Sequence, residues 1–167
     1  TRSIPFRFIQ NGTNLGFAKG NNPGLKKALD LGFDYVWLLN NDAVVDPHSL
    51  SKLVNAVERD HTIGAIGSQI LDLDSDQKLQ CFGGGYVNWV TGAVRLAKRP
   101  PSNNSSSFFL CGANILLRSS SLHDIGLLDE QFFLYWDDVD FCCRLHKTHW
   151  QCAVHKDAIV WHELSHT

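Results

Sequence analysis

The chain has 167 residues, of which 44% are hydrophobic and 19% charged, with a net charge of −2. This describes one soluble globular domain, residues 1–167, and excludes the basic excess of a nucleic-acid binder. No apolar run approaches the ~20 residues of a membrane span. The sequence lacks methionine and a signal peptide, so we expect a piece of a longer reading frame or a processed product. Five cysteines without a CxxC pair predict reduced thiols in a cytoplasmic protein.

The first part of the chain predicts a strand, a loop, a helix and another strand. Residues 4–10 alternate like a short strand, and residues 11–24 contain four glycines and four asparagines, as in a loop. Asn22-Pro23 indicates a helix start and Gly32 its end. Asp34–Leu39 is a nearly continuous apolar run, typical of a central strand covered on both faces.

A second helix and strand continue the alternation. Asp46-Pro47 repeats the cap-and-proline signal, and Ile63–Leu71 is a further strand candidate. The β-loop-α-β order predicts an α/β sandwich on a largely parallel sheet. The apolar face of this helix would consist of Leu50, Leu53, Val54 and Val57.

The second half of the chain is more irregular. It contains a polar segment, Lys98–Ser107, that is long enough for a mobile loop or lid. Other expected elements are a polar loop at 72–78, two short strands within 80–95, a strand at 108–118, a helix at 119–125, a helix from Trp136 to about Lys147, and short strands at 150–154 and 158–161.

Asn40-Asn41-Asp42 follows an apolar strand directly, and ligands of open α/β sheets bind beyond strand ends. Its oxygen ligands suit a divalent ion that holds phosphate. An ordinary turn explains these residues equally well. His162 also closes an apolar run; a lone histidine is usually structural, yet this one could complete a metal site with Asp42.

Three acids crowd the start of the helix after Trp136. Spacing places Asp137, Asp140 and Arg144 on one face and Asp138 nearest the buried side, where burial raises a carboxyl pKa and the helix N-terminus lowers it. Asp140 and Arg144 have the spacing of an ion pair. A purely structural alternative is that all three acids are N-terminal helix charges.

Other ligand classes fit less well. Cys142, His146 and His149 could share a helix face, but their spacing matches no standard zinc pattern. The segment 16–24 has neither a Walker motif nor GxGxxG after a strand. A glycine- and asparagine-rich loop before a helix still suits a phosphate or nucleotide.

Taken together, four motifs in order resemble a family 2 inverting glycosyltransferase of the rhamnosyltransferase and galactofuranosyltransferase-like branch. They cover about residues 8 to 163. The motifs are the NLGFAKGNNPG loop (14–24), WLLNND (37–42), the segment Gly112 to Arg118 with Gly126 to Phe133, and WDDVD to Arg144 (136–144) followed by Ala158 to His162.

The resemblance implies a GT-A fold, a three-layer α/β sandwich with a mostly parallel central sheet. It implies transfer of a sugar from a nucleotide diphosphate donor, with inversion, to a saccharide or lipid-linked saccharide acceptor. Asp138 would be the general base, and Asp42 with His162 would hold Mg²⁺ or Mn²⁺. Trp136 and Asp137 would contact the acceptor. The donor would be bound by Gly16, Lys19, Asn21, Asn22, Asn40 and Asn41.

Two features depart from the family pattern. The metal motif reads Asn-Asn-Asp instead of Asp-x-Asp, and no strand-helix-strand unit precedes Thr1, so the resemblance predicts an N-terminally truncated domain. Alternatives are a non-catalytic or truncated fragment that binds sugar nucleotides and a metal-dependent phosphoester hydrolase. We expect a role in polysaccharide synthesis in the cytoplasm or at the inner face of the membrane, with peripheral membrane association through missing parts and no nucleic-acid partner.

Overall fold

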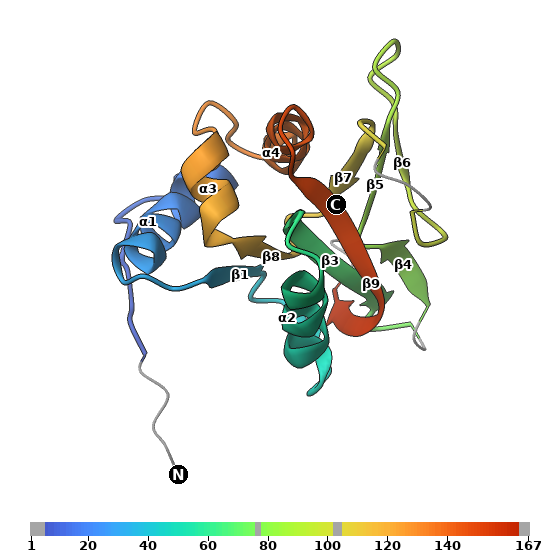
Figure 1. Ribbon diagram of the computed structural model, residues 1–167, viewed down its shortest axis with the longest axis horizontal. Helices are drawn as coiled ribbons and strands as arrows, with labels where there is room; N and C mark the ends of the chain where they lie inside the picture. The colour runs from blue at the N-terminus through green and yellow to red at the C-terminus, as the bar shows by residue number, and fades with distance from the viewer. Residues whose placement is uncertain (1–5, 76–77, 102–104, 164–167) are drawn as a thin grey trace.

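A computed structural model describes residues 6–75, 78–101 and 105–163 of the chain (Figure 1). Two α-helices lie in its first half and two in its second half. None of the described helices is both long and apolar enough to cross a lipid bilayer. The helices are α1 (Phe17–Asp30), α2 (Ser49–Arg59), α3 (Ser119–Ile125) and α4 (Asp137–His146).

The main sheet has the strand order β1-β8-β3-β9-β2, with β4 also paired to β3. Only the β3–β9 pair is parallel among its described pairings, so the predicted mostly parallel sheet is wrong and the sheet is mixed. The reason is the connections: a parallel pair needs a long crossover, whereas β3 turns back directly into β4. The strands are β1 (Tyr35–Leu39), β2 (Ala43–Val45), β3 (Ile63–Asp72), β4 (Leu79–Phe82), β8 (Asn114–Arg118) and β9 (Gln151–His162).

A smaller antiparallel sheet stands beside the main one (Figure 1). Its order is β6-β5-β7, and β5 and β6 form a hairpin. The region predicted to hold two short strands therefore holds three, β4 to β6. The strands of this sheet are β5 (Gly84–Val87), β6 (Val94–Leu96) and β7 (Phe108–Leu110).

The strand β1 matches its predicted span but lies at the edge of the described sheet rather than at its centre. Its apolar run is still explained by cover on both faces. Val36 packs against the large core cluster that includes α1 and α4, whereas Tyr35 and Trp37 pack against the smaller cluster around α2. Apolar side chains on both faces of a strand thus indicate that both faces are covered, but they do not indicate whether the strand is central or at the edge of the sheet.

The N-terminal region differs from its prediction. Residues 6–10 form no strand and are exposed, and residues 4–5 lie outside the described part. Helix α1 begins at Phe17, so Pro23 lies inside it instead of at its start. The physical reason is a tertiary partner: the Phe133 carbonyl accepts the Phe17 N–H at 2.9 Å, which satisfies one donor at the helix start.

Helix α2 begins two residues after Asp46-Pro47. The Asp46 carboxylate accepts the His48 N–H at 3.0 Å and the Asp46 carbonyl accepts the Ser49 N–H, so a turn precedes the helix. Leu53 and Val57 are buried as predicted, but Leu50 is largely exposed. Ser49, the first helical residue, is buried instead, and its hydroxyl bonds the Ile159 backbone of β9.

Two strand predictions have the wrong number of strands. Residues 108–118 divide into β7 and β8, in different sheets, because the chain turns at Cys111–Ala113. The two short terminal strands are one strand, β9, whose register against β3 shifts between Ser68 and Gln69 and so absorbs three extra residues. Residues 102–104 of the predicted loop or lid lie outside the described part.

A buried polar chain crosses three strands of the main sheet. The Trp37 indole N–H donates to Asn114 Oδ1 at 2.6 Å, and the Asn114 amide donates to the Ser68 hydroxyl. Asn114 and Ser68 are fully buried. Every member has a partner, as buried polar groups require.

Candidate active site

The segment that follows β1 and the last residue of β9 come together at the carboxyl ends of these strands. Ala43 of β2 is opposite His162 of β9 in the antiparallel ladder. This register places His162 Nε2 at 3.2 Å from Asp42 Oδ1 and at 3.3 Å from the Asn40 amide nitrogen. The structure therefore brings together the two residues predicted to bind a metal.

The chemistry of this pair suits a divalent cation. Asp42 Oδ1 is buried and has no hydrogen-bond partner, although His162 Nε2 lies close by. An unsatisfied buried carboxylate oxygen beside an imidazole nitrogen is a donor set that Mg²⁺ or Mn²⁺ can complete. Among the described residues no cluster of three or more His, Cys, Asp or Glu side chains is available, so phosphate and water oxygens would fill the remaining positions.

The three acids belong to the start of α4, which begins at Asp137. Tyr135 and Trp136 precede it with φ values of 64° and 67°, a left-handed conformation that non-glycine residues rarely adopt. Such backbone strain is concentrated at functional sites in proteins. The side chains of Phe133, Leu134, Tyr135 and Trp136 are exposed around this turn.

Asp138 is held by two backbone N–H groups. Its Oδ2 accepts the Gly112 N–H at 3.0 Å and its Oδ1 accepts the Val139 N–H at 2.8 Å. Burial raises the pKa of the Asp138 carboxyl, and these two hydrogen bonds only partly oppose the rise. A raised pKa is what a proton acceptor near neutral pH requires.

Asp137 was expected on the outer face, but only 3% of its surface is exposed, less than for Asp138. Helical spacing predicts the wrong order of burial for Asp137 and Asp138. Asp137 is the first helical residue, so the left-handed turn before it sets the direction of its side chain. Burial, followed by the nearby Asp138 charge, raises the pKa of Asp137 to about 6. The predicted pair of Asp140 and Arg144 is confirmed at 2.7 Å.

Gly112 connects the two halves of the site; it opens one of the four motifs, but no function was predicted for it. Its N–H binds Asp138, and the carbonyl of the next residue, Ala113, accepts the Asn40 N–H at 3.0 Å. A Cβ on Gly112 would lie 3.1 Å from the Phe17 ring. The glycine in the turn between the apolar segments of β7 and β8 was the feature of the sequence that could have indicated this contact.

A pocket of about 340 Å³ lies between the start of α1 and the end of β1. Lys19 is exposed and does not line it. Asn22 is buried and bonds the backbone of Leu128 and the Glu130 carboxylate, so it supports the fold beside the pocket. Four of the predicted donor-binding residues line the pocket: Gly16, Asn21, Asn40 and Asn41.

The possible zinc ligands near the C-terminus have other partners. Cys142 Sγ accepts the Leu110 N–H at 3.2 Å, and His146 Nε2 lies 2.9 Å from the Phe108 carbonyl oxygen. His149 packs on Trp150 with ring centroids 4.4 Å apart. These residues thus have structural contacts in the described part of the chain.

The fold is that of GT-A glycosyltransferases. Similar solved structures are GalNAc-T7 with UDP, GalNAc and Mn²⁺ (TM-score 0.72, 13% identity, 93% of this chain and 32% of that one) and S. aureus TarS (TM-score 0.56, 16% identity, 91% and 25%). Residues 6–167 match the model of the glycosyltransferase like family 2, and the chain belongs to that family.

Two curated relatives are similar along most of the chain. The N-acetylglucosaminyl-diphospho-decaprenol L-rhamnosyltransferase of Mycobacterium tuberculosis H37Rv is 29% identical over 184 residues, covering 96% of this chain and 60% of the relative. Galactofuranosyltransferase GlfT1 of Mycolicibacterium smegmatis is 28% identical over 148 residues, covering 85% and 48%. The chain thus spans about half to three fifths of the length of these relatives.

Proposed function

We propose that this domain transfers a sugar, with inversion, from a nucleotide diphosphate donor to a hydroxyl group of a saccharide or lipid-linked saccharide. The observation that carries the proposal is the position of Asp138, a carboxylate with a raised pKa beside an exposed aromatic turn. Through Gly112 and Ala113 it is linked to the strand end that bears Asp42. The names of the two curated relatives agree with this reaction class.

In the proposed reaction, Asp138 takes the proton of the acceptor hydroxyl while that oxygen attacks the anomeric carbon of the donor. The bond from the anomeric carbon to the diphosphate breaks, and the diphosphate leaves with the electron pair. A bound Mg²⁺ or Mn²⁺, held by Asp42 and His162, would supply positive charge to the leaving group. One displacement at the anomeric carbon gives inversion.

The remaining predicted residues have distinct proposed tasks. Gly16, Asn21, Asn40 and Asn41 bind the donor in the 340 Å³ pocket. Trp136 offers its exposed indole as a stacking surface for the acceptor sugar. Asp137, predicted to contact the acceptor, exposes only 3% of its surface, so we assign it no acceptor contact.

Turnover of nucleotide diphosphate sugars with Mg²⁺ or Mn²⁺ tests the proposal. We expect Asp138→Asn to lower kcat by ~10²–10⁴. Asp140→Asn is the matched control, because Asp140 already pairs with Arg144 and should leave most turnover intact. Equal turnover by wild type and Asp138→Asn would reject the base, and wild-type protein that neither turns over nor binds nucleotides would favour a non-catalytic domain.

A further inference from the structure

The β5–β6 hairpin projects from the molecule (Figure 1), and several of its apolar side chains are exposed to solvent. At its tip, Trp89 is 56% exposed and Val90 95% exposed. Val94 and Leu96 of the edge strand β6 are also largely exposed. Exposed apolar side chains gathered at one projecting element indicate an interaction surface rather than scattered surface residues.

The tip keeps several of its backbone N–H groups paired within the hairpin. The Asn88 carboxamide oxygen accepts the N–H groups of Val90 and Thr91 at 3.0 and 3.2 Å. The Asn88 carbonyl accepts the Gly92 N–H, and the Asn88 N–H donates to Ala93. Because these donors do not depend on water, the tip can enter the interfacial layer of a bilayer, where its carbonyls still reach water.

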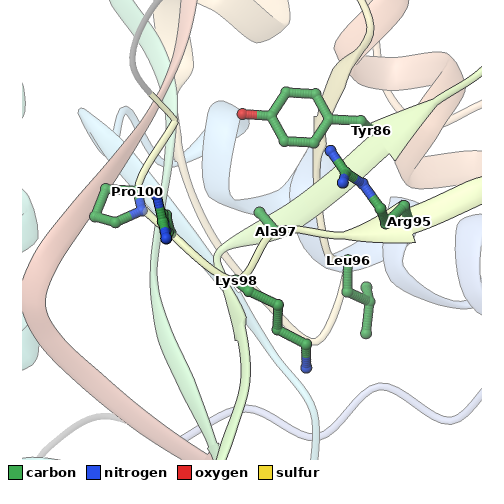
Figure 2. A pocket seen from close by; sticks show the side chains of 7 residues that line it. Tyr86, Arg95, Leu96, Ala97, Lys98 and Pro100 are labelled. Atoms are coloured by element: carbon green, nitrogen blue, oxygen red, sulfur yellow. The ribbon is translucent and has the colours of Figure 1, made fainter.

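The sequence segment that contains the hairpin carries charge of a single sign. The chain has 17 acidic residues, yet none occurs from Gln77 to His123. A hollow of about 730 Å³ beside the hairpin is lined by Arg95, Lys98 and Arg99 together with Tyr86. Figure 2 shows Arg95 directed toward the Tyr86 ring, in agreement with their direct pairing across the hairpin.

These three cations are available to an external anion. The salt bridges in the described part of the chain involve Lys52, Arg144 and His162, not the hairpin cations. Lys98 Nζ donates to the carbonyls of Leu79 and Gln80, which are neutral acceptors. Among the described residues, no ion pair therefore neutralises the positive charge of Arg95, Lys98 and Arg99.

We propose that the β5–β6 hairpin docks this domain onto the anionic surface of a lipid bilayer. Trp89 and Val90 enter the interfacial layer, where tryptophan is favoured, and Arg95, Lys98 and Arg99 face anionic headgroups. A small anionic solute could occupy the hollow but would leave the apolar tip in water, so a membrane accounts for both features. The inference does not depend on the proposed sugar transfer.

Co-sedimentation with vesicles tests this docking. We expect the protein to bind phosphatidylcholine vesicles that contain phosphatidylglycerol, to bind pure phosphatidylcholine weakly, and to dissociate as salt is raised. Arg95→Gln/Lys98→Gln/Arg99→Gln should weaken binding roughly a hundredfold, about fivefold for each charge. Lys26→Gln/Arg59→Gln/Lys147→Gln, which changes three exposed cations elsewhere, should change binding far less.

Insertion of the tip has a separate readout. Brominated lipids should quench tryptophan fluorescence, and Trp89→Phe should remove that quenching while vesicles are still bound. Trp89→Ser/Val90→Ser should release the protein from vesicles, whereas Leu31→Ser/Phe33→Ser, another exposed apolar pair, should not. Circular dichroism verifies folding of each variant.

Three outcomes would overturn the proposal. The triple Gln variant of the hairpin and Trp89→Ser/Val90→Ser could both bind vesicles as wild type does. Alternatively, the control triple variant could lose as much binding as the hairpin triple variant. Inorganic diphosphate could displace the protein from vesicles at constant ionic strength, which would show a discrete anion site in the hollow. Vesicle binding needs no donor sugar, so its failure is distinguishable from failure of turnover.

Discussion

The Asp138 carboxylate accepts a hydrogen bond from the Gly112 backbone N–H at 3.0 Å. Gly112 precedes Ala113, whose carbonyl accepts the Asn40 N–H, so one peptide segment contacts both sides of the candidate site. The position of the proposed base is thereby coupled to the strand end that carries Asp42. The expected effect of a substitution at Gly112 depends on this coupling.

Replacing Gly112 with alanine should impair turnover more than folding. The added Cβ would lie 3.1 Å from the Phe17 ring, so either the ring or the Gly112 backbone, whose N–H holds Asp138, must shift; its distance of 3.7 Å from Asp138 Oδ2 is an ordinary contact. We expect roughly 1–3 kcal/mol of destabilisation and about a hundredfold loss of kcat from a misplaced base. Urea denaturation and turnover measure the two effects. Gly24→Ala is the control, since nothing lies within 4 Å of its added Cβ.

Gly16 allows the closest backbone approach in the site. A Cβ there would lie 2.0 Å from the Phe133 carbonyl oxygen, and its φ of 78° is itself unfavourable for alanine. We expect Gly16→Ala to destabilise by roughly 3 kcal/mol or more. Gly12→Ala has a similar φ but meets no atom within 4 Å, so it should cost about 1–2 kcal/mol. Equal denaturation midpoints for the two variants would contradict the importance of the Phe133 contact.

The buried Asp137 carboxyl should make stability depend on pH. Its pKa is about 6 in the folded protein against 3.8 for an ordinary aspartate, so the folded state binds more protons between these values. The free energy of unfolding should therefore fall by roughly 2 kcal/mol as pH rises from about 4 to 6, out of roughly 3 kcal/mol over the whole titration. Asp137→Asn should flatten this decline, whereas Asp157→Asn, at an exposed carboxyl, should preserve it. Identical pH profiles for wild type and Asp137→Asn would refute the assignment.

A divalent cation should stabilise the protein when a nucleoside diphosphate is present. At 100 times its dissociation constant, a ligand of the folded state adds about 2.7 kcal/mol of stability. Mn²⁺ with the nucleotide should therefore raise Tm, and Asp42→Asn should abolish the metal-dependent part. Asp46→Asn, four residues along the chain, should respond as wild type does. A metal-dependent shift that persists in Asp42→Asn would place the cation elsewhere.

The sequence predicted the elements better than their arrangement. β1, β3 and α3 lie close to their expected spans because apolar runs and turn residues are local signals. The start of α1 at Phe17 could not be predicted, since its backbone partner, Phe133, is distant in sequence. The same applies to the single strand β9, whose continuity depends on an irregular ladder with β3.

The residues of the candidate site could be predicted from the sequence, but their burial and positions relative to one another could not. Motif order indicated Asp42, His162 and Asp138, and the structure brings Asp42 and His162 together. The burial of Asp137 could not be anticipated, because it follows from the left-handed residues Tyr135 and Trp136. The apolar hairpin tip was not singled out at all, although Trp89 and Val90 stand in a segment without acids.

The buried chain from Trp37 through Asn114 to Ser68 has a consequence for how the site is aligned. Side chains alternate along a strand, so a slip of β8 by one residue would turn Asn114 to the other face of the sheet. That slip would leave buried polar groups unpaired, at a cost of roughly 1–3 kcal/mol each. Since Gly112 and Ala113 directly precede Asn114, the polar chain fixes the register from which the contacts to Asp138 and Asn40 follow. The alignment of the candidate site is thus specified in the interior of the sheet.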